Sequence, residues 1–197
     1  SKLTKRYNTD QSLTFDASVH IVQDESGSGV NIADDGLILT CAHCLMEDQD
    51  SDDDTALIGV KKIVVFADGR MFEAVCTVAS IKQDLAVMKI HGVNGLPTAD
   101  ISTGTCTVDT EIVCVGNPSE YDLESNDPDA NVSFYPPVFH CSSGKVEGYC
   151  GGDLTVMTKS GLGKLKHGCW TYWGHSGAPI FNVNDSTVVG IHNSWDD

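Results

Sequence analysis

Three short segments of the chain carry side chains that together are able to perform nucleophilic catalysis. His43 follows an apolar run, Asp84 opens another, and Ser176 lies among glycines. A serine hydroxyl is a poor nucleophile at neutral pH, so an imidazole has to accept its proton during attack and return it to the leaving group. A carboxylate then holds the imidazole in the right tautomer. These residue types predict His43 as base and then acid, Asp84 as its partner, and Ser176 as nucleophile.

The segments around these residues resemble known catalytic signatures, in the same order along the chain. Chymotrypsin-like serine proteases carry the motifs T-A-A-H-C, D-L/I-A-L/V and G-D-S-G-G-P, to which three segments are similar: Leu39-Thr40-Cys41-Ala42-His43-Cys44, Asp84-Leu85-Ala86-Val87 and Gly174-His175-Ser176-Gly177-Ala178-Pro179. The likeness runs from about Ser28 to His192. It implies a serine endopeptidase that forms an acyl-enzyme and needs no cofactor. It also implies an all-β fold of two six-stranded antiparallel Greek-key barrels, with the active site in the cleft between them.

The glycines beside Ser176 allow the backbone to turn sharply. Such a turn lets the amides of Gly174 and Ser176 point at an oxyanion that develops on the substrate carbonyl. Loss of one donor of this kind costs about 10²- to 10³-fold in rate. The two amides are therefore the predicted oxyanion hole.

Two departures from the trypsin pattern affect what the resemblance implies. His175 stands where trypsin-type enzymes carry an aspartate that receives a new amino terminus, so activation by that salt bridge is not expected. Ser28 and Gly29 lie near the place of the usual disulfide partner of Cys44. That disulfide therefore cannot be assumed.

The two halves of the chain resemble different branches of these proteases. In the first half, four segments resemble the HtrA/Deg proteases: Ser26-Gly27-Ser28-Gly29-Val30, Asp35–Thr40, Phe66–Arg70 and Asp84–Ile90. In the second half, Thr171 and His192 resemble the specificity residues of glutamyl endopeptidases and of serine members of the viral 3C-like proteases. This second likeness implies a preference for Glu or Gln before the scissile bond.

The hydrogen-bonding chemistry supports such a pocket. An imidazole N–H from His192 and a hydroxyl from Thr171 are donors that suit a carboxylate or an amide. A protonated His192 would favour Glu, whereas a neutral ring would accept either residue. Trp170 and Asn193 are also expected to contact substrate, and Trp170 takes the place of the aspartate at the base of the trypsin pocket, so trypsin-like specificity is not expected. The alternative is that His192 is a core histidine and Thr171 an ordinary strand residue.

The elements that must position these residues are short strands. Apolar or alternating runs bounded by Gly, Asp, Asn or Pro predict eleven of them: Ala17–Gln23, Gly29–Ile32, Gly36–Thr40, Lys61–Phe66, Met71–Ala79, Leu85–Ile90, Val108–Val115, Val138–Val146, Leu154–Thr158, Ala178–Asn182 and Thr187–His192. A turn-rich stretch near 94–103 separates two domains, 1–97 with His43 and Asp84 and 98–197 with Ser176 and the pocket. The polar stretch Asn117–Pro137 is predicted to be a surface loop.

Composition restricts the class of partner. The formal charge is −16 with only 12 Lys and Arg residues, which argues against nucleic-acid binding. No apolar run approaches the roughly 18 residues of a membrane span. The expected partner is a polypeptide substrate. Oligomeric state and localisation stay open, since the polar amino terminus fits a processed secreted protein as well as an intracellular one.

Metal sites are not expected, although two alternatives exist. Asp48, Asp50 and Asp52 alternate within an acidic run, but the run lacks the glycine and the distal glutamate of an EF-hand, which favours a solvated loop. The eight cysteines are compatible with four disulfides or with thiols. Some of them are also able to hold zinc, either Cys141 with Cys150 or the pair His167-x-Cys169 with other thiols.

Two rival functions remain. One is an HtrA-like protease that prefers small aliphatic residues. The other is an inactive protease-fold binding module, in which His175 or a shortened second barrel disorders the oxyanion hole. The shortening is expected because the chain ends at Asp197, whereas the family continues with at least one more strand.

Overall fold

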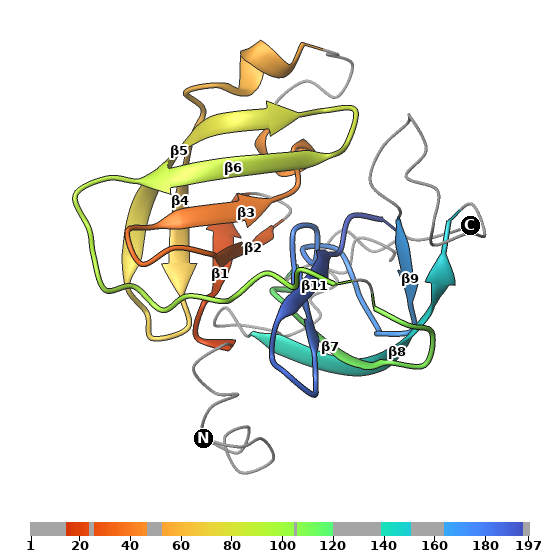
Figure 1. The fold of residues 1–197 in the computed structure, drawn as a ribbon. Helices are drawn as coiled ribbons and strands as arrows, with labels where there is room; N and C mark the ends of the chain where they lie inside the picture. Colours follow the sequence, from red (N-terminus) through yellow and green to blue (C-terminus); the bar gives the residue numbers. More distant parts are fainter. Residues whose placement is uncertain are drawn as a thin grey trace, which may run out of the picture.

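The first half of the chain is a closed β-barrel. The computed structural model describes residues 15–23, 26–46, 53–104, 106–119, 139–150 and 164–194. Six antiparallel strands follow the order β1-β2-β3-β6-β5-β4 around the barrel (Figure 1). Their bounds are β1 Ser18–Val22, β2 Ser28–Asn31, β3 Leu37–Thr40, β4 Lys61–Phe66, β5 Met71–Ser80 and β6 Leu85–Ile90.

The second half forms a curled sheet of five strands beside the barrel (Figure 1). The strands follow the order β11-β10-β7-β8-β9. Their bounds are β7 Glu111–Gly116, β8 His140–Tyr149, β9 Leu165–His167, β10 Pro179–Asn182 and β11 Val188–Ile191. The all-β prediction is confirmed, with one closed barrel and one half-barrel among the described residues.

Ten of the eleven predicted runs coincide with strands. The run Leu154–Thr158 lies outside the described residues, as do most of the predicted loop Asn117–Pro137 and the end Trp195–Asp197. Strand β9 was not predicted, because three residues of mixed polarity carry no readable alternation. Two 3₁₀ helices were also not predicted, η1 at His43–Leu45 and η2 at Asp54–Leu57.

Alternating side chains fill the barrel. Strand β6 alternates strictly between half-buried and buried residues, and Met88 and Ile90 point inward. They pack with Ile21, Ile38 and Phe66, each at most 1% exposed. Burying one such side chain contributes about 1.5–3 kcal/mol, so this core holds the strand ends that carry the site.

A second core joins the two halves. Val30 of β2 and Ala17 of the first half pack with Val113 and Val115 of β7, Phe181 of β10 and other buried residues of the second half. The ring of Phe15 meets Phe181 edge to face, with centroids 5.4 Å apart. The halves are therefore packed against each other, and the division at 97/98 stays a prediction. No helix in the described part of the chain is long and apolar enough to span a membrane.

Candidate active site

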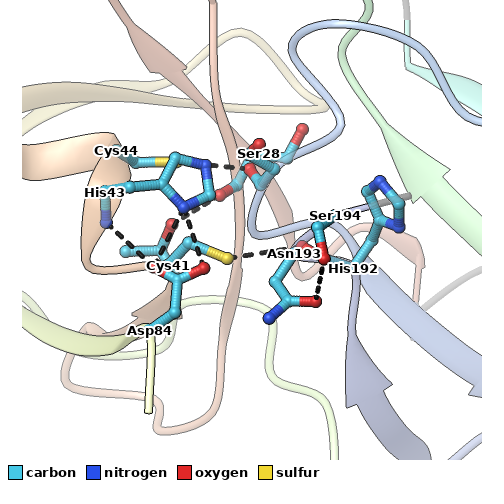
Figure 2. Close-up of polar contacts among 10 residues, drawn as sticks. Ser28, Cys41, His43, Cys44, Asp84, His192, Asn193 and Ser194 are labelled. Carbon is cyan, nitrogen blue, oxygen red and sulfur yellow. Dashed lines mark hydrogen bonds and ion pairs between the residues drawn. The ribbon is translucent and has the colours of Figure 1, made fainter. Parts of the chain in front are cut away.

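Strand pairing places His43 next to Asp84. β3 ends at Thr40, which pairs with Ala86 near the start of β6. His43 follows β3 and Asp84 precedes β6, so both lie at one edge of the barrel. Nδ1 of His43 lies 2.8 Å from one carboxylate oxygen of Asp84 and 2.9 Å from the other (Figure 2). The backbone amide of His43 also donates to Asp84, at 3.0 Å.

The backbone of Asp84 is in an uncommon conformation. Its φ is +52°, in the left-handed region that side chains other than glycine rarely adopt. The residue ends the turn between β5 and β6, and its amide donates to the carbonyl of Ile81. Strain of this kind persists where the surrounding structure enforces it, often at functional sites. Here it accompanies a carboxylate that accepts from both the ring and the amide of His43.

Opposing effects act on the pKa of His43. Burial lowers the pKa, whereas hydrogen bonds with Asp84 and Cys44, together with the charge of Asp84, raise it. The net result is a pKa above the ordinary value of 6.5. Asp84 thus makes the ring a stronger base.

Ser28 of β2 clamps the segment around Ser176. The amide of Ser28 donates to the carbonyl of Ser176 at 2.8 Å, and its hydroxyl donates to the carbonyl of Gly174 at 2.7 Å. The same hydroxyl accepts from the amide of Asn117 at 2.9 Å. A buried residue of the first half therefore fixes the backbone on both sides of His175. In the sequence, Ser28 lies in a segment that resembles the HtrA/Deg proteases and near the place of a missing cysteine, but neither feature predicted this clamp.

The glycines of this segment are required by the close approach of the halves. Gly177 has a φ of +83°, and a Cβ there would collide with the carbonyl of Ser28 and the hydroxyl of Thr40. Gly174 has a φ of +92°, and a Cβ there would collide with the carbonyl of Asn117. Both positions need glycine for conformation and for space.

The backbone amides around Ser176 differ in their partners. The amide of His175 donates to the carbonyl of Tyr172 at 3.0 Å, whereas the amides of Gly174 and Ser176 donate to no backbone acceptor in the described part of the chain. These are the two amides predicted to bind an oxyanion. They are able to donate to a substrate carbonyl, and this role stays a prediction.

Two thiols flank His43. Cys44 Sγ lies 3.5 Å from the carbonyl of Ser176. Cys41 Sγ lies 3.3 Å from the carbonyl of His192 (Figure 2). All eight cysteines are free thiols in the structure, which favours the thiol alternative over four disulfides. The zinc alternatives, Cys141 with Cys150 or His167 and Cys169 with other thiols, do not gather among the described residues, where the one group of three possible ligands is Cys41 with His43 and Asp84. Most of the acidic run, with Asp48, Asp50 and Asp52, lies outside them.

His175, which precedes Ser176, is fully buried. Its Nδ1 lies 3.1 Å from the amide of Tyr172 and 3.0 Å from the carbonyl of that residue. The ring packs edge to face against His140 and Trp170, with centroids 5.6 and 5.7 Å apart. Burial lowers the pKa of His175 to about 4, although its bond to Tyr172 opposes the shift. A neutral packed ring thus stands where trypsins carry an aspartate.

His192 is 4% exposed and lies directly after β11. Its Nδ1 is 3.2 Å from Nε2 of His167 in β9. Burial, and then the neighbouring histidines, lower the pKa of His192 to about 3. The ring is therefore neutral at neutral pH. The partner His167 was not predicted here, because the sequence singled it out only as a possible zinc ligand.

The other predicted substrate-binding residues are less buried than His192. Trp170 is 49% exposed and stacks on Tyr172, with centroids 6.0 Å apart and the rings parallel within 1°. Thr171 and Asn193 are half-buried, and Asn193 accepts from the hydroxyl of Ser194 at 3.2 Å. Their contacts with substrate stay predictions.

His43, Asp84 and Ser176 lie within a segment that matches a known protein family. A model described as a trypsin-like peptidase domain matches residues 27–191, from just before β2 to the end of β11. The chain belongs to this trypsin-like peptidase domain family. The match covers both the barrel edge with His43 and Asp84 and the clamped segment with Ser176.

Curated relatives of this trypsin-like peptidase domain carry protease names. Serine endoprotease DegS of Salmonella typhimurium is 37% identical over 93 residues, which are 47% of this chain and 23% of that protein. Putative protease Do-like 14 of Arabidopsis thaliana is 30% identical over 167 residues, 84% of this chain and 34% of that protein. Serine protease HTRA4 of Homo sapiens is 27% identical over 173 residues, which are 85% of this chain and 30% of that protein. The chain thus spans between 23% and 34% of these relatives, and the predicted likeness to HtrA/Deg proteases is confirmed.

The neutral histidines of this trypsin-like domain predict a loss of stability in acid. The pKa values of His175 and His192 are lowered on folding, to about 4 and about 3, from the ordinary 6.5. The two neutral rings therefore contribute fully to the free energy of unfolding above pH 6.5. This contribution is lost as the pH falls toward their pKa values in the folded state. Between pH 7 and pH 5 the two should cost about 4 kcal/mol of the free energy of unfolding. Urea unfolding over this pH range measures the loss.

The variant His192→Gln removes one of the two titrating rings and should roughly halve that loss. The matched control is His91→Gln, because His91 lies on the surface. An unchanged pH dependence in His192→Gln would show that this ring does not carry the effect.

Proposed function

We propose that the chain is a serine endopeptidase that hydrolyses peptide bonds of a polypeptide substrate. The observation that carries the proposal is the carboxylate of Asp84 bonded to Nδ1 and to the amide of His43. This pair lies beside a Ser176 segment that Ser28 ties to the same barrel. Membership of the trypsin-like peptidase family supports the same chemistry.

The proposed reaction needs only groups of this chain. His43 Nε2 accepts the hydroxyl proton of Ser176 as Oγ attacks the substrate carbonyl, while Asp84 holds the ring and stabilises the imidazolium. The amides of Gly174 and Ser176 donate to the oxyanion. His43 then gives the proton to the leaving amine, which produces an acyl-enzyme. Water, activated by the same ring, releases the acid.

The proposed specificity is for Glu or Gln before the scissile bond. Thr171 precedes the nucleophile segment and His192 follows β11, the strand that pairs with β10 just beyond that segment. A hydroxyl and an imidazole N–H are suitable donors for a carboxylate or an amide. Trp170 and Asn193 would flank the bound peptide.

The protonation state of His192 refines this specificity. Its pKa of about 3 leaves the ring neutral above acidic pH, so it offers no positive charge to a glutamate. A neutral donor serves the amide of glutamine as well as a carboxylate. The bond to His167 constrains the tautomer of the ring. We therefore expect Gln to be accepted at least as well as Glu.

An HtrA-like protease with a small aliphatic preference is the second candidate. It is favoured by the names of the relatives, which include serine endoprotease DegS and serine protease HTRA4. The 93 residues shared with DegS are only 47% of this chain. Substrate preference therefore has to be measured on this chain itself.

Cleavage of a peptide library, with each cut assigned by mass spectrometry, separates these functions. Cuts after Glu or Gln support the proposed pocket. Cuts after Val or Ala instead would reject the pocket and establish the HtrA-like preference. The absence of any cut that depends on Ser176 would favour the inactive binding module.

We expect His192→Ala to reduce kcat/KM for Glu and Gln peptides by about 10²-fold, the effect of losing one buried hydrogen-bond donor together with its packing. For peptides with Ala before the scissile bond, kcat/KM should fall much less. Steady-state kinetics on matched peptides tests this difference, and the surface variant His91→Gln is the control. An equal loss on all peptides would mean that His192 supports the fold and does not select the substrate.

A further inference from the structure

The proposed reaction leaves a buried thiol beside the catalytic pair without a role. One ligand atom from each of Cys41, His43 and Asp84 lies within 4.8 Å of the other two. The three residues come from the end of β3, from η1 and from the turn before β6. Figure 2 shows the thiol of Cys41 beside the His43–Asp84 pair. A soft sulfur, an imidazole nitrogen and a carboxylate oxygen therefore converge on one point.

We propose that this cluster is an inhibitory Zn²⁺ site, with Cys41 Sγ, Nδ1 of His43 and the carboxylate of Asp84 as ligands. Zinc accepts sulfur, nitrogen and oxygen ligands together, and three protein ligands leave its fourth position to water. The thiolate selects against Ca²⁺ and Mg²⁺, which prefer oxygen ligands.

The distances require only a small adjustment. In a tetrahedral zinc site with ordinary bond lengths, a nitrogen and an oxygen ligand are about 3.3 Å apart. Nδ1 of His43 is 2.8 and 2.9 Å from the two oxygens of Asp84, so ring and carboxylate must separate by about 0.5 Å to admit the ion. A sulfur and a nitrogen or oxygen ligand of such a site are about 3.5 Å apart. The sulfur of Cys41 lies within 4.8 Å of one ligand atom each of His43 and Asp84, so it has to approach them by about 1.3 Å at most.

Exposure provides a route of entry. The side chains of His43 and Asp84 are 38% and 24% exposed, whereas Cys41 is fully buried beneath them. An ion would meet the ring and the carboxylate first and the thiol last. The thiol now points its proton at the carbonyl of His192, 3.3 Å away, and this proton is released to solvent when the thiolate binds zinc. The formal charge of −16 also favours a cation.

Inhibition follows from the nitrogen that zinc would occupy, and this step rests on the proposed peptidase activity. In the proposed reaction, the ring of His43 that accepts the proton of Ser176 is neutral and carries its own proton on Nδ1, facing Asp84. Zinc on Nδ1 moves that proton to Nε2, so Nε2 is no longer able to accept the proton of Ser176. The metal also engages the carboxylate that stabilises the imidazolium. Zinc binding and catalysis therefore exclude each other.

Metal binding can be measured without any substrate. Co²⁺ gives a thiolate-to-cobalt absorption band, and Zn²⁺ displaces it, so one titration yields both stoichiometry and affinity. We expect the band in wild type and its loss in Cys41→Ser, with zinc affinity reduced by at least 10- to 100-fold, the effect of removing even an outer-shell partner. The matched control is Cys76→Ser, a buried thiol of β5 in the same barrel, which should bind like wild type.

The melting temperature with and without Zn²⁺ is a second measurement, which distinguishes loss of the metal site from misfolding of the variant. Zn²⁺ should raise the Tm of wild type and of Cys76→Ser, but not the Tm of Cys41→Ser or of His43→Ala. An unchanged cobalt band and zinc affinity in Cys41→Ser would overturn the proposal.

Peptidase assays then test the inhibitory role. Zn²⁺ should inhibit wild type, a chelator should restore activity, and Cys41→Ser should resist inhibition by the same factor by which its zinc affinity falls. Equal inhibition of Cys41→Ser would overturn the proposal and would direct attention to another site, such as His167 with His192. Zinc binding that depends on Cys41 in a chain without peptidase activity would leave the metal site standing and reject the proposed function.

Discussion

Ser176→Ala should lower kcat by about 10⁶-fold, the order found when a serine protease loses its nucleophile. In the proposed reaction the hydroxyl of Ser176 forms the covalent bond to the substrate, a role that the methyl group of alanine is unable to fill. The binding surface remains, so KM should change far less than kcat. Hydrolysis of the best library peptide, followed over long times, measures the residual rate.

The matched control for this variant is Ser102→Ala, a half-buried serine of the second half whose hydroxyl donates to the carbonyl of Gly104 and accepts from the amide of that residue. It should keep wild-type activity. Urea unfolding of Ser176→Ala should match wild type, because its clamp to Ser28 uses backbone atoms of Ser176. Activity that survives in Ser176→Ala would place the nucleophile elsewhere and reject the proposed reaction.

Asp84→Asn should lower kcat by about 10⁴-fold at neutral pH. The side-chain N–H of asparagine is able to donate to Nδ1 of His43, which then acts as the acceptor. The ring proton is left on Nε2, so the ring is in the wrong tautomer. Asp84 also raises the pKa of His43. Its removal should therefore shift the acid limb of the kcat/KM profile to lower pH, since the ring then loses its proton at lower pH.

Asp68→Asn is the matched control for this second prediction. Asp68 is an exposed carboxylate in the hairpin turn between β4 and β5, where it binds Arg70. It should leave kcat and the pH profile unchanged. If Asp84→Asn and Asp68→Asn behaved alike, Asp84 would not be the partner of His43 in catalysis.

The strands and the residues of the proposed triad could be predicted because their signals are local. Alternating polarity marks β6, and a short motif surrounds each of His43, Asp84 and Ser176. The contact between His43 and Asp84 depends on the pairing of β3 with β6, which local patterns do not encode. It was expected from the resemblance to a family in which this pairing is known.

Other features could not be predicted because they depend on contacts between distant segments. The hydroxyl of Ser28 reaches Gly174, 146 residues further along the chain. His192 finds His167 in β9, a strand too short to show a pattern. The approach of Cys41 to the catalytic pair depends on how β3 meets the turn before β6. A sequence names the groups in each case, but tertiary packing decides which of them meet.

The clamp at Ser28 makes the two halves mutually dependent. Residues 98–197 contain Ser176, the proposed nucleophile, but the amide and hydroxyl of Ser28, which hold the backbone of its segment, belong to the other half. We expect a fragment of the second half alone to contain the intact motif around Ser176, but without a fixed backbone conformation. Mixing it with residues 1–97 should restore activity only as the two fragments dock, so the catalytic geometry is a property of their assembly and of neither piece by itself.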